Sequence, residues 1–544
     1  MNMAELGSVA GLARKAGIAL CVSTALSAMP SAGFAQDKPQ SGGTLRVVTY
    51  EPLCLDQIEG TSRNTQTALQ SIYDRLVSES LDGRFHPWIA SQWTISDDQL
   101  TYAFTIRDGV KFHDGTPLDA EAVRFNLQRW LDVKKAGGAP IESISASGNI
   151  VTVKLRKAYS PLLHDLSEPA VGLISPASIQ KYSKEERCAG GPGITAGSGP
   201  FKVLSRTPGR DLVFERNDDY NWGPKDAAHE GKAYLDKVEL RFLKEDSVRV
   251  GAVESNQADI ATGVPAISVE DIKAKPHLKL LQAQQPGIPW SFWLNQSKAP
   301  LDDVKVREAL RLGADYAGLV EAVFLGTATP AYAALTPAVA TGYDASLEKS
   351  WKFDAKKAQA LLDEAGWKVG SDGIRVKDGK RLTLRGISAA PWTNQQRDLY
   401  AQGLKAAFAA IGVDYVRDVV DFGTADARFK ANDYDIVDTS QAASEPNLLY
   451  GAFYSTETWD KGNTNWGFVK DKDLDSALAA GLATTDREKR IAAYKAAQKI
   501  IAEKVYLIPI ANPTVLLAAN KKVQGVTFGT SGQIGSYYDV WLAK

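Results

Sequence analysis

The sequence predicts an α/β protein whose two parts are built differently. In the first part, segments such as Tyr102–Ile106 and Val151–Leu155 place apolar residues at every second position, which indicates half-buried strands. From about residue 300 onward, helical and extended patterns alternate along the chain. A strand, a long helix and a second strand between residues 381 and 420 form a βαβ unit, which normally joins parallel strands.

Strands dominate the first part. They are expected at Thr44–Tyr50, Asp211–Arg216 and Val238–Phe242. Between the two alternating strands, apolar residues recur with helical spacing and predict a helix with one buried face: Val123, Leu127, Trp130 and Leu131. A stretch rich in glycine and proline at 189–200 then interrupts the chain before further strands.

The second part contains the βαβ unit and a candidate binding site. Asp354 is expected to cap a helix that ends at Gly366. The next elements are predicted in the order strand Arg381–Ser388, helix Asn394–Ile411, strand Val413–Val420 and strand Tyr434–Thr439. Because ligands of open α/β sheets bind beyond the carboxyl ends of the strands, the loops at 389–393 and 440–447 are candidate site segments.

The first 35 residues are predicted to be a cleaved secretory signal. Arg14 and Lys15 precede a short apolar run, and small residues lead to Ala35, after which we expect the cut. The run is too short to span about 30 Å of hydrocarbon. Cys21 follows Leu20, where lipid-attachment motifs have a small residue, so lipidation is not expected. We expect a soluble periplasmic protein.

Two cysteines, Cys54 and Cys188, remain after the signal is removed. In an oxidising compartment a single disulfide between them is possible. Two separately buried thiols are the alternative, and the sequence does not choose between them.

Charge and composition argue against nucleic acid or an anionic membrane as a partner. The chain has 63 basic and 64 acidic residues, which gives a formal net charge of −1. The 12 Trp and 19 Tyr side chains could supply rigid contact surface with a polar tip in a polar-ligand cleft. No feature points to an oligomer, so we expect a monomer.

The motifs of common enzymes are missing from the sequence. The five histidines lack the i, i+4 spacing of a helical metal site: His86, His113, His164, His229 and His277. There is no phosphate-binding loop, and Ser198 lacks a nucleophile-elbow context because Ala196 replaces the first glycine. The segment from Asp471 fails as a calcium loop at Ser476 and Leu482. These absences exclude the common enzyme classes but not a novel enzyme, and our expectation is that the protein has no catalytic residues, metal or cofactor.

Five segments, in order along the chain, resemble one known family. They are "GGTLRVVTYEPLCLD" (42–56), "TYAFTIRDGVKFHDGTPLDAEAVRFNL" (101–127), "GSGPFKV" (197–203), "FWLNQSKAPLDDVKVREALRLGADY" (292–316) and "REKRIAAYKAAQKIIAEKVYLIPI" (487–510). Together they resemble the bacterial extracellular solute-binding proteins of family 5, which serve peptide, opine and nickel ABC importers. Ser198 stands where the family usually has threonine.

The resemblance implies a periplasmic-binding-protein fold of type II with an inserted subdomain. In this fold two lobes are joined by a hinge, and the ligand binds between them. The implied boundaries are 42–85, 197–284 and 506–544 for the core of the first lobe, 86–196 for the insertion and 285–505 for the second lobe. The implied function is to capture a small polar organic solute and to deliver it to a membrane permease of an ABC importer. The sequence does not distinguish a role in transport from a role in signalling to a membrane sensor.

The resemblance also bears on the solute. Relatives that bind dipeptides hold the amino group with an Asp and the carboxylate with an Arg, and these positions fall at Ala442 and about Pro391 here. Thr439 stands where a Trp is common. Because a buried charge without a partner is costly, we predict that the solute is not an ordinary dipeptide. Longer peptides, opine or sugar conjugates and metal chelates stay open, and an exported hydrolase is a less favoured alternative.

Nine residues are predicted to contact the solute, from the first-lobe loop, the hinge side, the strand-end loops and the segment "NTNWGF": Leu53, Cys54, Trp290, Trp293, Trp392, Ser440, Gln441, Asn465 and Trp466. Rings and amide or hydroxyl groups of this kind suit peptide backbones, sugars or opine-like conjugates. The alternative is that each Trp packs in the core and that Asn465 caps a turn.

Overall fold

The computed structural model describes residues 38–60, 63–133 and 138–544. The predicted secretory signal, including Arg14, Lys15, Cys21 and the cut after Ala35, lies outside these residues. Within the described ranges, none of the helices has both the length and the apolar character needed to span a membrane.

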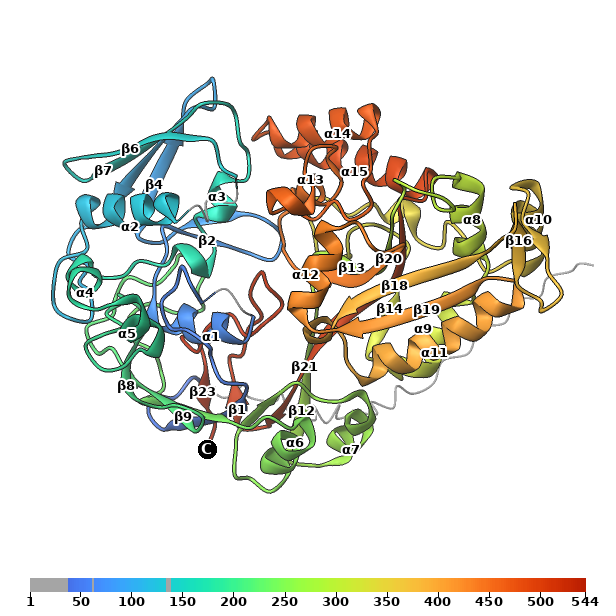
Figure 1. Ribbon diagram of the computed structural model, residues 1–544. Coiled ribbons are helices and arrows are strands. Elements are labelled where there is room, and N and C mark those ends of the chain that lie inside the picture. The colour runs from blue at the N-terminus through green and yellow to red at the C-terminus, as the bar shows by residue number, and fades with distance from the viewer. Residues whose placement is uncertain (1–37, 61–62, 134–137) are drawn as a thin grey trace, which may run out of the picture. The chain divides into compact units, whose positions relative to one another are not determined.

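A twelve-stranded mixed sheet runs through the described chain (Figure 1). The strand order is β19-β18-β20-β13-β21-β11-β1-β10-β9-β8, and β12 and β14 also pair with β21. The strands are β1 Thr44–Thr49, β8 Phe201–Thr207, β9 Asp211–Arg216, β10 Lys237–Phe242, β11 Ile260–Thr262, β12 Leu278–Gln284, β13 Ile288–Leu294, β14 Ala328–Pro330, β18 Thr383–Ala389, β19 Asp414–Val420, β20 Ile436–Gln441 and β21 Leu507–Asn520. Strand β21 pairs with β13 near its start and with β11 near its end, so it joins the two parts of the sheet.

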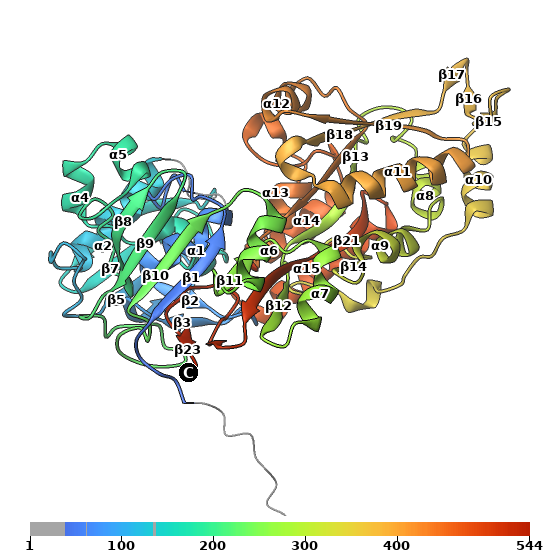
Figure 2. The same cartoon turned by 90° about the horizontal axis from the view of Figure 1, so that it is seen from below.

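Two sets of elements flank β21, and we call them lobe I and lobe II. Lobe I contains β1 to β12, α1 to α7, β22 and β23, and lobe II contains β13 to β20 and α8 to α15. Each set buries its own apolar clusters, and Figure 2 shows the blue and green elements of lobe I beside the orange elements of lobe II. The exact domain boundaries inferred from the sequence stay a prediction.

The helices and the small sheets complete the two lobes. In lobe I the helices are α1 Arg63–Ile72, α2 Ala120–Asp132, α3 Leu162–Asp165, α4 Pro176–Lys181, α5 Lys184–Ala189, α6 Asp246–Glu254 and α7 Val269–Ala274. In lobe II they are α8 Val304–Leu312, α9 Tyr316–Phe324, α10 Ala355–Glu364, α11 Gln395–Ala410, α12 Phe422–Lys430, α13 Leu448–Phe453, α14 Lys472–Leu482 and α15 Arg487–Glu503. The small sheets contain β2 Val77–Glu79, β3 Phe85–Pro87, β4 Ala90–Ile95, β5 Thr101–Ile106, β6 Ile141–Ser147, β7 Ile150–Leu155, β15 Lys368–Val369, β16 Arg375–Lys377, β17 Lys380–Arg381, β22 Val523–Gln524 and β23 Trp541–Leu542.

The alternating strands and the first amphipathic helix are confirmed. Strands β5 and β7 pair with each other in a four-stranded sheet, and every second residue of β5 is buried. Helix α2 buries Val123, Leu127 and Trp130, and Leu131 is partly buried against the same cluster. The side chain of Asp119 caps this helix by accepting from the Ala122 N–H at 2.9 Å.

The βαβ unit is confirmed as well. Strand β18 pairs in parallel with β19 and with β20, and α11 connects β18 to β19. Asn394 caps α11, and Gly412 follows it with a φ of 84° that glycine readily adopts. The predicted strand 381–388 is divided, because Lys380–Arg381 forms β17 in a small sheet and β18 begins at Thr383.

The glycine-rich stretch allows a close approach between two segments. A Cβ atom at Gly197 would lie 2.0 Å from the carbonyl oxygen of Ile72, and one at Gly199 would lie 2.7 Å from it. The Gly199 N–H donates to the same carbonyl oxygen at 2.9 Å. Only glycine fits at these two positions, which explains the composition of the turn.

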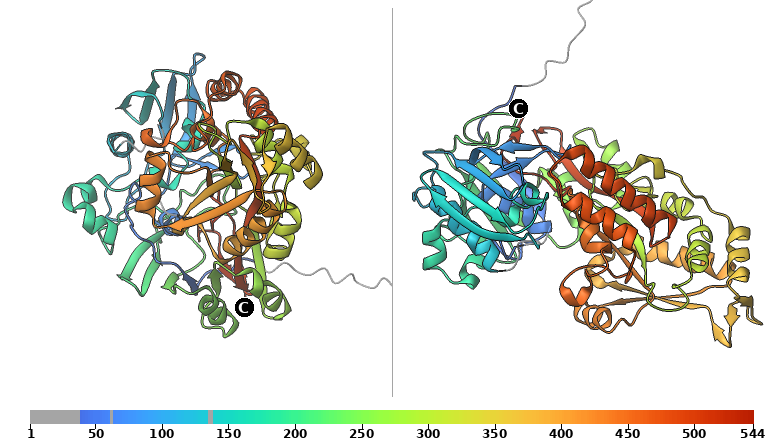
Figure 3. Two further views of the ribbon diagram at one scale, coloured as in Figure 1. Left: turned by 45° about the vertical axis from the view of Figure 1, so that its right-hand side comes forward. Right: turned by 90° about the horizontal axis from the view of Figure 1, so that it is seen from above.

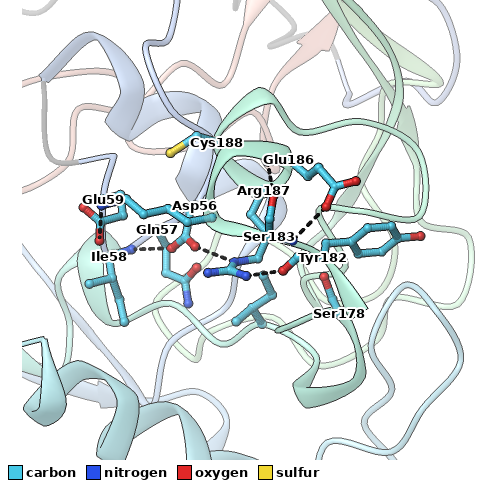
Figure 4. A network of polar contacts seen from close by, with 12 residues as sticks. Asp56, Gln57, Ile58, Glu59, Ser178, Tyr182, Ser183, Glu186, Arg187 and Cys188 are labelled. Atoms are coloured by element: carbon cyan, nitrogen blue, oxygen red, sulfur yellow. Dashed lines mark hydrogen bonds and ion pairs between the residues drawn. The ribbon is translucent and has the colours of Figure 1, made fainter. Parts of the chain in front are cut away.

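The loop after β1 is held against two helices of lobe I by a disulfide and by ion pairs. Cys54 and Cys188 are joined in a disulfide, which settles the alternative that the sequence left open. Asp56 pairs with Arg187 of α5 (Nε to Oδ2, 2.8 Å) and with Arg129 of α2 (Nη2 to Oδ2, 2.6 Å). Figure 4 shows the side chains of Asp56 and Arg187 facing each other. This network fixes the loop close to the end of β1.

Candidate functional site

Two adjoining cavities lie where β21 passes between the lobes. Their volumes are about 270 and 330 Å³. Both are lined by Tyr50, Gly263 and Val264, just beyond the carboxyl ends of the parallel strands β1 and β11, and by Thr514 and Leu516 of β21. We call the two cavities together the interlobe groove. Its position agrees with the strand-end rule for open α/β sheets.

The lobe I wall of the groove contains a hydrogen-bonded Tyr and Asp. The Tyr50 hydroxyl donates to Asp246 Oδ1 at 2.6 Å, and Arg249 forms an ion pair with the same carboxylate. The Arg249 guanidinium lies 4.0 Å from the centre of the Tyr50 ring. Burial raises the pKa of Tyr50, and the hydrogen bond to Asp246 raises it further. Tyr50 therefore keeps its proton at neutral pH.

The lobe II wall presents a guanidinium, an indole and an amide. Arg397, in the first turn of α11, lies 5.1 Å from the centre of the Trp290 ring. Arg397 donates to the Trp392 carbonyl oxygen at 2.5 Å and to Ser440 Oγ at 3.0 Å. Asn394 lines the groove and accepts from the Arg397 N–H at 2.9 Å. These groups hold the Arg397 side chain at the cavity wall.

A buried ion pair supports this wall from behind. Asp438 on β20 is 0 % exposed, accepts from the Trp290 indole N–H, and pairs with Arg417 on β19 (Nε to Oδ2, 2.6 Å). Arg417 also donates to Asp398 at 2.7 Å and to Thr393 at 2.8 Å. Burial lowers the pKa of Arg417, but Asp438 and Asp398 more than offset this and raise it. The network fixes Trp290 and the start of α11.

The lobes touch again away from the groove, in contacts that we call the interlobe latch. The Ser160 N–H donates to the Leu482 carbonyl at 2.9 Å, and Ser160 Oγ donates to the Gly481 carbonyl at 3.0 Å. Ser444 Oγ of lobe II donates to Glu79 Oε2 of lobe I at 3.4 Å. The Leu482 side chain packs into the core of lobe I. Gly481 and Leu482 are the last residues of α14, which packs beside α15. The helices α14 and α15 are among the red helices in Figure 3.

Charged side chains are buried beside the latch. His164 of α3 pairs with Glu79 (Nδ1 to Oε2, 2.6 Å), and Glu445 of lobe II pairs with Arg490. Burial lowers the pKa of His164, but the carboxylate of Glu79 more than offsets this and raises it to about 10. Burial also raises the pKa of Asp165 to about 7. His164 and Asp165 therefore bind their protons more tightly in the folded protein than in the unfolded chain.

The family follows from a match to a large part of the chain. The family model described as "Bacterial extracellular solute-binding proteins, family 5 Middle" matches residues 84–461. The chain belongs to this family. The members are substrate-binding proteins and not enzymes, and they serve importers of peptides, nickel and opines. The resemblance seen in the five sequence segments is thereby confirmed.

Individual relatives agree along nearly the whole chain. The glutathione-binding protein GsiB of Escherichia coli (strain K12) is 27 % identical over 518 residues, which cover 93 % of this chain and 95 % of GsiB. The oligopeptide-binding protein AppA of Bacillus subtilis, solved with a nonapeptide, matches with a TM-score of 0.76 and 22 % identity over 93 % of this chain and 100 % of AppA. NikA of Brucella suis, solved with Fe(III)-EDTA, matches with a TM-score of 0.79 and 24 % identity over 91 % of this chain and 99 % of NikA.

These likenesses confirm the type II fold but do not select a solute for this family member. The ligands of these relatives are glutathione, a nonapeptide and Fe(III)-EDTA. The chain is a solute-binding component of an ABC importer, and its relatives are periplasmic binding proteins. The solute has to be argued from the residues of the groove.

Four of the residues predicted to contact the solute lie at or beside the groove. Trp290 lines it although its side chain is buried, and Arg397 donates to Ser440 Oγ and to the backbone carbonyl of Trp392. The Trp392 ring itself stacks on Phe429, with ring centres 5.8 Å apart. Gln441 follows Ser440 at the end of β20, and its side-chain nitrogen is buried without an acceptor among the described residues. The structure thus brings these four residues together, and their contact with a solute stays a prediction.

The structure places three other predicted residues in the core of lobe II. Trp293 is 1 % exposed, stacks on Phe453 with ring centres 5.4 Å apart, and meets Trp466 edge-on at 5.0 Å. The Asn465 side chain accepts from the Val469 N–H at 2.9 Å and donates to the Val469 carbonyl at 3.1 Å. These contacts match the alternatives named for them, ring packing and a turn cap. None of the three lines the groove.

The two predicted residues of the first-lobe loop are also outside the groove lining. Leu53 is 79 % exposed at the surface, and the sulfur of Cys54 is bonded to Cys188. Their contact with a solute stays a prediction.

Local sequence signals did not reveal the charged groups of the groove or the ion pair behind it. Arg397 lies just beyond the strand-end loop that was considered, in the first turn of the helix that follows it. Asp438 was detectable as a carboxylate directly after the apolar pair Ile436 and Val437 in a predicted buried strand. Its partner Arg417 lies on another strand, and no local pattern connects the two.

Proposed function

We propose that the chain captures a small polar organic solute, peptide-like but not an ordinary dipeptide, in the interlobe groove and delivers it to a membrane permease. The observation that carries the proposal is that both lobes contribute polar groups to one groove. Tyr50 and Asp246 come from lobe I, and Asn394 and Arg397 come from lobe II. A solute that touches both walls stabilises the arrangement in which the lobes are together.

The charges of the groove favour a solute with a neutral or anionic end toward lobe II. In the loop at 439–447, Ala442 occupies the position inferred for an amino-group anchor. The carboxylate of this loop, Glu445, is engaged by Arg490. Arg397 presents a guanidinium at the groove, which suits a carboxylate or a peptide carbonyl. Longer peptides and opine-like conjugates both satisfy this requirement.

We also infer export to the periplasm as a monomer, with the signal removed near Ala35. Two observations support this: the relatives are periplasmic, and a disulfide such as that between Cys54 and Cys188 persists in oxidising compartments. Sequencing the N-terminus of the protein from a periplasmic extract tests the cut. A mature protein that begins far from residue 36 contradicts it.

A thermal-shift screen tests the solute class. The panel contains dipeptides, longer peptides, opines, oligosaccharides and metal chelates. A solute present at 100 times its Kd should add about 2.7 kcal/mol to the free energy of unfolding and raise the melting temperature. We expect shifts from longer peptides or opine-like compounds. Shifts from dipeptides alone would contradict the charge argument for the groove.

Replacing Arg397 with glutamine should weaken binding of the solute found in the screen. A hydrogen bond to a charged group contributes about 1.5–3 kcal/mol, which corresponds to a loss of roughly 10- to 100-fold in affinity. Isothermal titration calorimetry measures this change. Arg210→Gln removes an arginine that is 70 % exposed and should leave the affinity unchanged. Equal affinities of all three proteins would place the solute outside the groove.

A further inference from the structure

A third cavity lies within lobe I. Its volume is about 260 Å³. The lining comes from residues 70–88, Ser167, residues 200–227 and the C-terminal segment 527–539, and none of it is shared with the interlobe groove. The cavity is therefore a separate hollow with its own chemistry.

A buried arginine faces this cavity, and its side chain has no polar partner among the residues that the structure describes. Arg75 lines it and is 8 % exposed. Its guanidinium lies 4.7 Å from the centre of the Trp88 ring, which covers one face of the group. Among the described residues, no side-chain hydrogen bond or ion pair involves Arg75, and its Nε is buried without an acceptor. Burial lowers the pKa of Arg75, so the site disfavours the charge that it contains.

Three carboxylates whose charges act on Arg75 are engaged by other groups, and one of them, Glu168, lies 3.7 Å from His164 Nε2. Asp74 accepts from the Tyr220 hydroxyl at 3.1 Å and from the Trp222 indole N–H at 2.8 Å. Asp226, which lines the cavity, accepts from Ser78 Oγ at 2.5 Å. None of them lies within ion-pair distance of the guanidinium. A buried charge without a close partner is costly, and a ligand that supplies the partner removes that cost.

We propose that this cavity is a second binding site, for a small monocarboxylate whose two oxygens accept from the guanidinium of Arg75. The planar fork of an arginine matches a carboxylate in a bidentate pair. Ser536 adds a second donor, because its Oγ accepts from the Tyr538 N–H at 3.1 Å and keeps its own proton to donate. Leu81 and Phe528 line the same cavity and suit an apolar body on the ligand.

The other charges of the lining restrict the ligand to a single negative charge. Glu79, Asp226 and Asp539 all line the cavity. Glu79 accepts from His164 at 2.6 Å, and Asp539 accepts from His229 at 2.9 Å. A second carboxylate on the ligand would meet these groups and be repelled. The site therefore selects a monocarboxylate against a dicarboxylate of equal length.

Calorimetric titration of the mature protein with hexanoate, hexanamide and adipate tests the proposal. We expect saturable binding of hexanoate and binding at least about tenfold weaker for hexanamide and adipate. Adipate binding as tightly as hexanoate overturns the selection for one charge. If hexanamide binds as tightly as hexanoate, the proposed role of the guanidinium is wrong. If hexanoate does not bind, the proposed site itself is wrong.

Three variants locate the bound hexanoate. Arg75→Gln should lose at least about tenfold in affinity while it keeps or raises the melting temperature, because it removes an uncompensated buried charge. Ser536→Leu fills the cavity from a partly exposed wall, keeps Arg75, and should also abolish binding. Arg397→Gln changes only the groove and should bind hexanoate as the wild type does. Loss of binding in Arg397→Gln with retention in the other two overturns the proposal and leaves the proposed function of the groove standing.

Discussion

Replacing Asp56 with alanine should lower the free energy of unfolding by about 3–5 kcal/mol. Asp56 is 0 % exposed and accepts from Arg129 at 2.6 Å and from Arg187 at 2.8 Å. Both arginine side chains are themselves mostly buried. Without the carboxylate, two guanidinium groups remain in a poorly solvated place with their main counter-ion removed. Urea unfolding followed by tryptophan fluorescence measures the loss.

Asp218→Ala is the matched control for Asp56→Ala. Asp218 also contacts two cations, Arg216 at 2.8 Å and Lys232 at 3.1 Å, but its side chain is 66 % exposed. Water screens such pairs, so the control should lose no more than about 1 kcal/mol. The disulfide still joins the Asp56 loop to α5 in both variants. If the two variants lose similar free energies of unfolding, burial of the carboxylate does not determine the size of the loss.

Local sequence signals were sufficient for the elements that carry their own start and stop signals. Helix α11 is an example, since Asn394 caps it and Gly412 ends it. The sequence did not predict which distant strands pair with each other. Nothing in residues 507–520 indicates that one strand pairs with β13 in lobe II and with β11 in lobe I.

The candidate site was predicted only in part, and the aromatic residues show why. Trp290 and Trp293 both lie on β13, three positions apart, and side chains so spaced on a strand point to opposite faces. Trp290 packs in one cluster of lobe II and Trp293 in another. Residue type alone could not tell which face borders the groove. That choice depends on β21 and on α11, which become neighbours of β13 only in the folded protein.

Replacing Glu79 with glutamine should lower the free energy of unfolding near pH 6 by about 3–5 kcal/mol, because it breaks the buried pair with His164. The dependence on pH should change as well. The folded-state pKa of His164 is raised from 6.5 to about 10, so its contribution is complete below pH 6.5 and is lost as the pH rises toward 10. The pKa of Asp165, raised from 3.8 to about 7, adds a loss of the same sign between these values.

In Glu79→Gln, burial is no longer offset by the closest negative charge, so the pKa of His164 should fall and the loss of stability between about pH 7 and 10 should become small. Urea titrations across this range measure the slope. Glu121→Gln removes a carboxylate that is 65 % exposed and pairs with Arg124, and it should keep the wild-type slope. An unchanged slope in Glu79→Gln would exclude His164 as the titrating group.

The same substitution should reach the groove through the latch. Glu79 also accepts from Ser444 of lobe II, and His164 lies in the field of Glu445 of lobe II, which Arg490 of the same lobe engages. Weakening this contact favours separation of the lobes, and a solute held by both walls then dissociates faster. We expect Glu79→Gln to raise the dissociation rate near pH 6 and wild-type release to accelerate as the pH rises. Stopped-flow measurement of the groove solute separates this from global destabilisation through Asn126→Ala. This variant removes a buried amide bonded to Ile174 inside lobe I, outside the groove lining, and should release its solute at the wild-type rate.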